Sequence, residues 1–430
     1  MIRTKQLLLP CLLAVAGVLY ADEAAAAPTQ SLGAAQASAP AATTTAAVTL
    51  SAVPGEAVTT YGWADQAKLK YASSKKITLI DDASYPDPKK KRQAFTKAIG
   101  SSAAAFIVIS GDIDLSDGAV TDSDHSYYDA FDKTSHRRLH DDIIYPVTSN
   151  KTIIGVQNAR ICYGGLQIRE ASNIIIRNVT FWDAHGSTEY DTAVTQYSES
   201  KASIDNVVIR DSKGIWIDHC TFSDGVCHDM SRNYNHDGLL DIPAGQFVTI
   251  SYCDFHNHDK VMLVGTGEKA TNPAERTITL HHNYFHGTTQ RTPRTRGTLM
   301  HIYNNVYDNI GVPENTGYCL GPGTEACFAV QNNYFGSRLG NIVDFYDKST
   351  GTKATAQLYY AGNSEDLSAE NTKLSNSKQK RALTDFLTDT IPWKISYDYE
   401  SAMTSWEEAK AVVLTQAGAG KPVTVAGTTY

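Results

Sequence analysis

Beyond residue 20 the sequence has no apolar run of the roughly 20 residues that a membrane-spanning helix requires, so we expect no membrane insertion and no membrane partner. The long apolar run that does occur, Leu7 to Tyr20, follows the basic residues Arg3 and Lys5 and is followed by small residues up to Ala27. This order is typical of a secretory signal peptide. We therefore expect residues 1–27 to be removed and the protein to be secreted.

An excess of positive charge is also lacking. Lys and Arg number 38 against 46 Asp and Glu, which gives a net charge of −8. The predicted signal peptide carries two residues of each sign, so its removal leaves that charge unchanged. Nucleic-acid binding rests on a basic surface, so nucleic acid is excluded as a partner. An anionic substrate would need a local cationic patch or a bound cation.

Large apolar side chains are scarce between residues 28 and 55, which are almost wholly Ala, Ser, Thr, Gln and Pro. Such a segment cannot bury enough apolar surface to fold, so we expect a disordered linker over 28–55. Residues 56–430 are predicted to form one catalytic domain, because repetitive all-β architectures routinely hold a single domain of this size. Short helices are expected at Pro86–Gly100 and within 401–420.

Six short runs of β-branched and aliphatic residues end at an aromatic side chain, with spacings between 22 and 41 residues. Repeats of this length are typical of solenoids. Further short strands lie between the runs, so each coil is expected to carry at least two strands. The aromatic positions are Phe181, Phe222, Phe255, Phe285, Tyr307 and Phe335.

The position two residues before each aromatic is Cys or Asn in five of the six runs. Identical residues at one position of successive coils indicate a ladder of stacked side chains, in which Asn amides hydrogen-bond along the stack. This favours a parallel β-helix over a propeller, which needs four strands per repeat, and over a sandwich. The ladder positions are Val179, Cys220, Cys253, Asn283, Asn305 and Asn333.

Six cysteines remain after the predicted signal peptide, and export would permit disulfides. Cys220 and Cys253 would lie on adjacent coils, roughly 4.8 Å apart by strand spacing, either as a disulfide or as two buried thiols. Cys319 and Cys327 close a loop that contains Gly and Pro, and they are the pair that we expect to be bonded.

Three aspartates are candidates for a cation site. Asp205 opens one strand, and Asp237 and Asp241 lie in the segment HDGLLDI of the next coil. Stacked coils would bring them onto one face, where three carboxylates suit Ca²⁺ better than zinc. The alternative is a turn on the surface, because Asp-Gly is also a turn signature.

Cationic side chains follow these acids. Arg291, Arg294 and Arg296 lie in a stretch, Arg276 to Tyr307, that contains no Asp or Glu, so they are available to bind an anion such as a carboxylate. Lys260 lies between the acids and the arginines. The alternatives are a solvated loop, or salt bridges to distant acids, and a solvated lysine.

The neighbouring histidines show no spacing typical of zinc sites, since no pair is completed by a Cys or a third His in a recognised pattern. Structural roles are therefore expected for them. They are His256, His258, His281, His282 and His286.

The sequence resembles family 1 polysaccharide lyases, the pectate lyases. The motifs that carry the resemblance are GIWIDHCTFSDG, HDGLLDI, VTISYCDFHNHDKVMLVG and HHNYFHGTTQRTPRTRGTLMHIYNNVYDN, in that order. The resemblance covers residues 100–350 well and the rest loosely. It implies a right-handed parallel β-helix, with a substrate cleft on the outside of one sheet, and a monomer is expected.

The resemblance also implies roles for the candidate residues. Asp205, Asp237 and Asp241 match the family's calcium-binding acids, and Arg291 matches the catalytic base. Lys260 and Arg296 match groups that bind substrate carboxylates, and Arg294 beside them is expected to bind substrate as well. Ser203 stands where some members have a further acid, which implies a weaker calcium site or more reliance on the substrate's carboxylates.

The implied reaction breaks the α-1,4 bond of polygalacturonate by β-elimination, beginning with the C5 proton α to the uronate carboxylate. Ca²⁺, Arg and Lys would stabilise the enolate-like charge. One rival is a pectin lyase acting on methyl-esterified polymer, which would have no need of the three acids. The other is a β-helix that binds polysaccharide without cleaving it.

Overall fold

The computed structural model describes residues 48–118, 121–122, 143–184, 204–226, 236–267, 270–311, 317–351, 353–375 and 381–430, which lie in a compact unit that begins at Thr45. The predicted signal peptide, 1–27, lies outside the described residues. Within them, no helix is long and apolar enough to cross a membrane.

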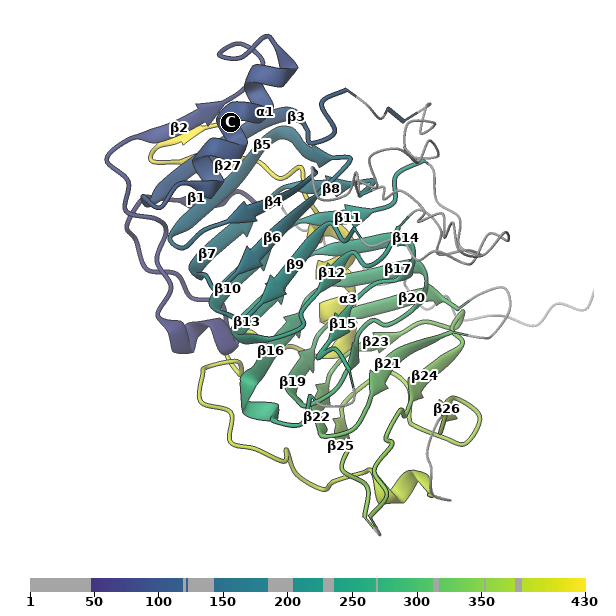
Figure 1. The fold of residues 1–430 in the computed structure, drawn as a ribbon. Helices are drawn as coiled ribbons and strands as arrows, with labels where there is room; N and C mark the ends of the chain where they lie inside the picture. Colours follow the sequence, from purple (N-terminus) through teal and green to yellow (C-terminus); the bar gives the residue numbers. More distant parts are fainter. Residues whose placement is uncertain are drawn as a thin grey trace, which may run out of the picture. The chain divides into compact units, whose positions relative to one another are not determined.

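The fold is a stack of coils whose strands form three parallel faces (Figure 1). The first face contains β2 (Ile77–Ile80), β3 (Ala105–Asp114), β5 (Lys151–Cys162), β7 (Ser172–Arg177), β10 (Ser212–Asp218), β13 (Gly245–Ser251), β16 (Arg276–His281), β19 (Thr298–Tyr303), β22 (Ala326–Gln331) and β25 (Gln357–Ala361). The second face contains β8 (Thr180–Trp182), β11 (Thr221–Ser223), β14 (Asp254–Lys260), β17 (Tyr284–Gln290), β20 (Val306–Ile310) and β23 (Tyr334–Phe335), and β5 pairs with strands of both faces.

The third face is built from shorter strands. They are β4 (Ile144–Val147), β6 (Gly165–Arg169), β9 (Val207–Arg210) and β12 (Leu240–Asp241), followed by β15 (Leu263–Val264), β18 (Arg294–Thr295), β21 (Tyr318–Pro322), β24 (Asn341–Asp344) and β26 (Thr372–Lys373). A bridge between Ile242 and Val264 joins the two groups. The chain visits the three faces in turn and returns to the first one coil later, so neighbouring strands are parallel. The predicted right-handed parallel β-helix is confirmed, with three strands in a full coil.

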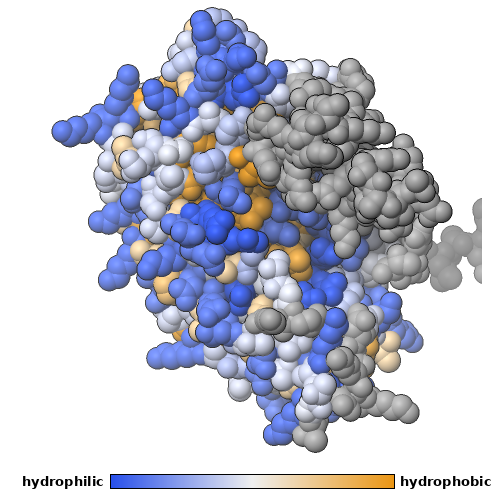
Figure 2. Space-filling view, viewed as in Figure 1, coloured by the Kyte–Doolittle hydropathy of each residue, from blue (hydrophilic) through white to orange (hydrophobic). Residues whose placement is uncertain are grey.

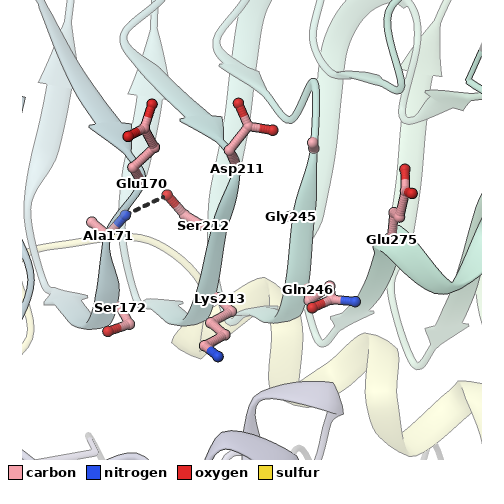
Figure 3. A pocket seen from close by; sticks show the side chains of 10 residues that line it. Glu170, Ala171, Ser172, Asp211, Ser212, Lys213, Gly245, Gln246 and Glu275 are labelled. Carbon is pink, nitrogen blue, oxygen red and sulfur yellow. Dashed lines mark hydrogen bonds between the residues drawn. The ribbon is translucent and has the colours of Figure 1, made fainter.

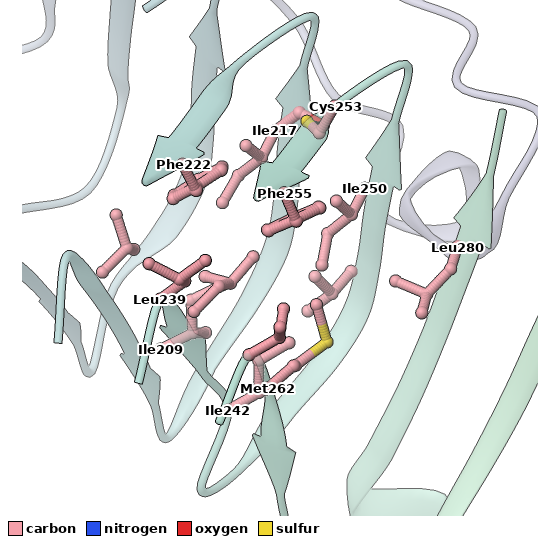
Figure 4. Close-up of a cluster of buried hydrophobic side chains, with 14 of the residues drawn as sticks. Ile209, Ile217, Phe222, Leu239, Ile242, Ile250, Cys253, Phe255, Met262 and Leu280 are labelled. Carbon is pink, nitrogen blue, oxygen red and sulfur yellow. The ribbon is translucent and has the colours of Figure 1, made fainter. Parts of the chain in front are cut away.

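The predicted aromatic positions form one stack inside the coils. Consecutive rings from Phe181 to Phe335 are parallel to within about 11°, with centroids 4.8 to 5.1 Å apart. Figure 4 shows Phe222 and Phe255 among the aliphatic side chains of the other faces. Each stacked pair adds roughly 0.5–1.5 kcal/mol beyond the area that it buries.

The asparagine ladder is also confirmed. The Asn305 amide donates to Asn333 Oδ1 at 3.0 Å, and Asn305 Oδ1 accepts from both the backbone and the side-chain nitrogen of Asn283 at 2.9 Å. The residue before each ladder position, such as Asn304 (φ 53°), has a left-handed backbone. The ladder therefore satisfies the backbone groups of the tight turn between the first and second faces.

Both predicted helices form. The first, α1 (Pro88–Gly100), begins after Asp87, whose carboxylate accepts from two backbone N–H groups, and packs on β2, β3 and β4 at the first coils. The second, α3 (Trp406–Gln416), packs against the side of the second face, with Trp406 stacked on Tyr334. Short 3-10 helices occur at η1 (Trp63–Ala67), η3 (Pro273–Glu275) and η4 (Leu383–Asp385).

Part of the linker prediction is wrong. Leu50–Ala52, inside the predicted linker 28–55, forms β1, which pairs with β27 (Val423–Val425) near the carboxyl end of the chain, and β27 pairs with β28 (Thr428–Thr429). Leu50 and Ala52 are buried. Composition could not reveal this strand, because its partner lies about 370 residues away in the sequence.

The cysteine pair expected to be bonded is not bonded. Cys319 packs in the core, whereas Cys327 is partly exposed and contacts Gln357 on the next coil, so the two side chains point to different sides of the chain. Cys220 and Cys253 are two buried thiols on adjacent coils. Their prediction left this outcome open.

Candidate functional site

Four of the predicted site residues lie at the same corner of four successive coils. Backbone hydrogen bonds run from Asn206 to Gly238, from Leu239 to Val261 and from Val261 to Gln290, with N···O distances of 3.0 to 3.3 Å. These contacts place four side chains on four successive coils, in the order Asp205, Asp237, Lys260 and Arg291. The corner lies between the end of β14 and the short strands β12 and β15.

Gly238 lets two of the acids approach each other. Its backbone N–H donates to Asp205 Oδ1 at 2.5 Å. A Cβ atom at this position would lie 2.6 Å from Asp241 Oδ1 and 2.7 Å from Asp205 Oδ1, closer than real contacts allow. Glycine is therefore required here for the two carboxylates to lie on either side of the turn.

Two of the three carboxylates have raised pKa values. Burial, together with the charges of Asp241 and Asp237, raises the pKa of Asp205 well above its usual value. Burial also raises the pKa of Asp241 to about 7, with Asp237 adding to the rise, while the Leu263 N–H, Arg291 and Lys260 oppose it. A buried group of like charges is costly unless a cation neutralises it.

The donor set fits a calcium ion. Asp205 Oδ1 accepts from Gly238 and Asp241 Oδ1 accepts from Leu263 at 2.8 Å, but no described donor contacts the second oxygen of either carboxylate. Hard oxygen ligands of this kind are those that Ca²⁺ prefers. One oxygen of Asp237 already forms an ion pair, since its Oδ1 lies 2.7 Å from Lys260 Nζ.

The cations lie beside these acids. The Lys260 side chain is buried, and its ion pair with Asp237 fixes its position. Arg291 has a left-handed backbone (φ 62°), and its carbonyl accepts from the Met262 N–H at 2.9 Å. Its Nε is buried without a hydrogen-bond partner, and its guanidinium forms no ion pair with any described acid. Within the described part of the chain, Arg291 therefore has no ionic partner that would compete with a ligand.

The other two arginines lie on β18 and just after it. The Arg294 guanidinium lies 3.8 Å from the ring centroid of Tyr346, a cation–π contact. The charges of Arg294 and Arg291 both oppose the rise that burial causes in the pKa of Tyr318. The Arg296 backbone N–H donates to the Val264 carbonyl at 2.9 Å.

Sequence reasoning missed two features of this part of the molecule. Tyr346 and Tyr318 were not singled out, because only the packing of β21 and β24 brings them to the arginines. His258 was expected to have a structural role and has one, because its Nε2 lies 2.9 Å from the Asp237 carbonyl and its Nδ1 lies 2.7 Å from Asp224 Oδ1. The second missed feature is the cluster of Asp254, His256 and His286 at the other end of β14.

A separate groove runs along the turns that precede the first face (Figure 3). The backbone N–H of Ala171 donates to Ser212 Oγ at 3.1 Å there. Glu170, Asp211 and Glu275 line the groove, and Lys213 is the one basic residue among its lining. Because the acids outnumber the basic groups, this groove is unsuited to an anionic polymer. Figure 2 shows hydrophilic residues over most of the visible face.

Comparison with known proteins agrees with the resemblance. The family model described as pectate lyase matches residues 37–422. Pectate lyase E of Dickeya chrysanthemi is 31% identical over 392 residues, which cover 86% of this chain and 92% of that protein. The pectate lyase of Bacillus subtilis is 30% identical over 292 residues, covering 65% of this chain and 66% of that protein.

Solved structures share the fold. A thermostable pectate lyase is 26% identical with a TM-score of 0.61, and a pectate lyase bound to a hexasaccharide is 23% identical with a TM-score of 0.63. Each alignment covers 85% of this chain and 98% of the other. A third, in complex with trigalacturonate, is 21% identical with a TM-score of 0.51, and covers 84% and 98%. The chain therefore belongs to the pectate lyase family and is a polysaccharide lyase.

Proposed function

We propose that this protein is a secreted, monomeric, calcium-dependent lyase that cleaves α-1,4-linked polygalacturonate, the de-esterified form of pectin, by β-elimination to unsaturated oligogalacturonides. The observation that carries the proposal is the corner at which Asp205, Asp237 and Asp241 meet Lys260 and Arg291. Relatives solved with a hexasaccharide and with trigalacturonate support an acidic polysaccharide as the substrate.

The acids would hold the metal. A bound Ca²⁺ would neutralise the uronate carboxylate and so make the neighbouring C5 proton more acidic. The same ion reconciles a protein of net charge −8 with a polyanionic substrate, because it offsets the three clustered carboxylates. Lys260, Arg294 and Arg296 would bind further carboxylates of the polymer.

Arg291 is proposed to remove the C5 proton. An arginine base is unusual, because its pKa lies above roughly 12 in water. Arg294 lies three residues further along the chain, and the buried Nε of Arg291 has no hydrogen-bond partner among the described residues. A base must be unprotonated before it can accept the C5 proton, and an arginine side chain is protonated at neutral pH. We therefore expect an optimum at alkaline pH.

Two rival functions make different predictions. A pectin lyase would prefer methyl-esterified polymer and would tolerate chelation, but the three clustered carboxylates argue against it. A β-helix that binds polygalacturonate without cleaving it would release no unsaturated product. The Arg291 guanidinium, which forms no ion pair with a described acid and lies next to Lys260 in the stack of coils, argues for chemistry as well as binding.

The deciding experiment is an ultraviolet assay for unsaturated product on polygalacturonate and on methyl-esterified pectin, with and without a calcium chelator. We expect cleavage of polygalacturonate that the chelator abolishes and added Ca²⁺ restores. Arg291→Lys should lower turnover by about 10²–10⁴-fold, the usual contribution of a general base. Arg338→Lys, at an exposed position on another part of the surface, is the matched control and should keep full turnover. Full turnover by Arg291→Lys would refute the assignment of the base.

Secretion and the monomeric state are tested separately. The mature protein should appear in the medium with a mass that corresponds to a chain beginning near residue 28. Light scattering of that protein should give the mass of a single chain, and a dimer mass would refute this part of the proposal.

A further inference from the structure

The repeat that builds the aromatic core also builds a cluster of ligands outside it. Asp254 and His256 flank Phe255 on β14, and Tyr284 and His286 flank Phe285 on β17. The two strands pair in register, Asp254 with Tyr284 and His256 with His286. Because successive side chains of a strand point to opposite faces, the buried phenylalanines force these neighbours to the outside.

The outer side chains converge on one carboxylate oxygen. Asp254 Oδ1 lies 3.1 Å from His256 Nδ1 and 2.9 Å from His286 Nε2. The three side chains are accessible, with exposed fractions of 22%, 20% and 31% for Asp254, His256 and His286. All three donor atoms lie within 4.8 Å of one another.

The rings are held in place by stacking. The His256 and His286 centroids are 5.0 Å apart with 24° between the planes, and Tyr284 stacks on His286 at 4.1 Å. A metal site needs ligands whose rotamers are fixed before the ion arrives. Here the register of β14 and β17 and the stacked rings provide that order.

We propose that Asp254, His256 and His286 form a binding site for a divalent transition metal of the zinc type, distinct from the calcium site. With metal–ligand bonds of about 2.0–2.2 Å, the ligand atoms of a tetrahedral ion lie roughly 3.3 Å apart. The observed 2.9 and 3.1 Å contacts need to open by only a few tenths of an ångström. Two imidazoles and one carboxylate, with a fourth position left to water, suit Zn²⁺ and not Ca²⁺.

The surrounding charges are mixed. Asp308 on β20 lies opposite His286 in the strand register, and its negative charge favours a bound cation. Lys421 interacts electrostatically with Asp254, and its positive charge disfavours a bound cation. Its Nζ, however, donates to the Ala417 carbonyl at 3.2 Å. The site lies at the opposite end of β14 from Lys260, so the bound ion would take no part in cleavage. It would instead link β14 to β17 and stabilise their pairing.

The simplest alternative is a carboxylate that accepts hydrogen bonds from two histidines and binds no metal. Calorimetric titration of the full mature protein with ZnCl₂, in saturating CaCl₂, separates the two. We expect one Zn²⁺ per chain, a rise in melting temperature with Zn²⁺, and a tetrahedral cobalt(II) spectrum when Co²⁺ replaces it.

Two variants complete the test. His286→Gln should weaken Zn²⁺ binding by at least about tenfold, since even loss of an outer-shell partner costs 10–100-fold. Tyr284→Phe keeps the stacked ring and removes no ligand, so its affinity should equal that of the wild type. The proposal is wrong if the wild type binds no Zn²⁺, or if His286→Gln binds it equally well. Neither result bears on cleavage of polygalacturonate, which is measured separately.

Discussion

Asp241 makes the stability of the calcium-free protein depend on pH in an unusual direction. Its pKa is about 7 in the folded protein and 3.8 in an ordinary carboxyl group. Between these two pH values, Asp241 therefore keeps its proton in the folded state and has lost it in the unfolded state. The contribution of Asp241 to the free energy of unfolding is therefore fully present below pH 4. It falls as the pH rises from 4 through 7, and it is level above that.

The magnitude follows from the shift. Each pKa unit corresponds to 1.36 kcal/mol, so a rise of roughly three units gives at most about 4 kcal/mol. The side chain is partly exposed, and solvent screening reduces this value. Asp205 acts in the same direction, because its pKa is raised as well.

Histidines elsewhere act in the opposite direction. Burial lowers the pKa of His281 to about 4 and that of His301 to about 3, so the contribution of both to stability increases as the pH rises toward 6.5. The informative quantity is therefore the difference between the wild type and Asp241→Asn. In that difference the histidine contributions cancel.

The assay is denaturant unfolding of both proteins in a calcium chelator at pH 4, 5.5, 7 and 8.5. The stability of the wild type relative to Asp241→Asn should fall as the pH rises from 4 to 7. Ca²⁺ at a hundred times its dissociation constant should return about 2.7 kcal/mol to the wild type at neutral pH. Parallel pH profiles for the two proteins would refute the reasoning.

Four further predictions test the site and the scaffold. Gly238→Ala should weaken calcium binding in calorimetry, because its Cβ would meet two carboxylates; unchanged affinity would contradict the close approach. Phe255→Ala should cost about 3–5 kcal/mol in denaturant unfolding, against less than about 1.5 for Phe255→Leu if the stack tolerates repacking. Asn305→Ala should cost about 1–3 kcal/mol for each partner left unsatisfied, so a neutral effect would rule out the ladder as a stabilising feature. A reductant should leave the melting temperature unchanged, because the described cysteines are free; a drop would reveal a disulfide.

The repeat itself was readable in the sequence. Phe255 and Phe285 end short apolar runs, and the asparagines two residues before the aromatic recur, so a local pattern predicted the repeat and the ladder, whereas the stacking of the aromatic rings was found only in the structure. The candidate acids and arginines were also found, although their roles came from resemblance to a family. Residue types alone left turn and surface alternatives open for Asp205 and Asp237.

The errors share one cause. Leu50–Ala52 looked disordered because its partner strand lies at the other end of the chain. Cys319 and Cys327 looked paired because they are near in sequence, but one faces the core and the other the next coil. Proximity along the chain does not reveal on which side of a strand a side chain lies.

The sequence by itself determined the solenoid, its aromatic core and the identity of the charged residues, since these depend on local periodicity and composition. Only the tertiary structure decided which residues meet. Stacking at one corner brought Asp205, Asp237 and Asp241 close enough to raise the pKa values of two of them. The register of β14 and β17 placed His256 beside His286, a pair that no spacing rule had connected. Coil lengths vary, so the residue that lies one coil away is fixed by hydrogen-bond register and not by a constant step along the chain.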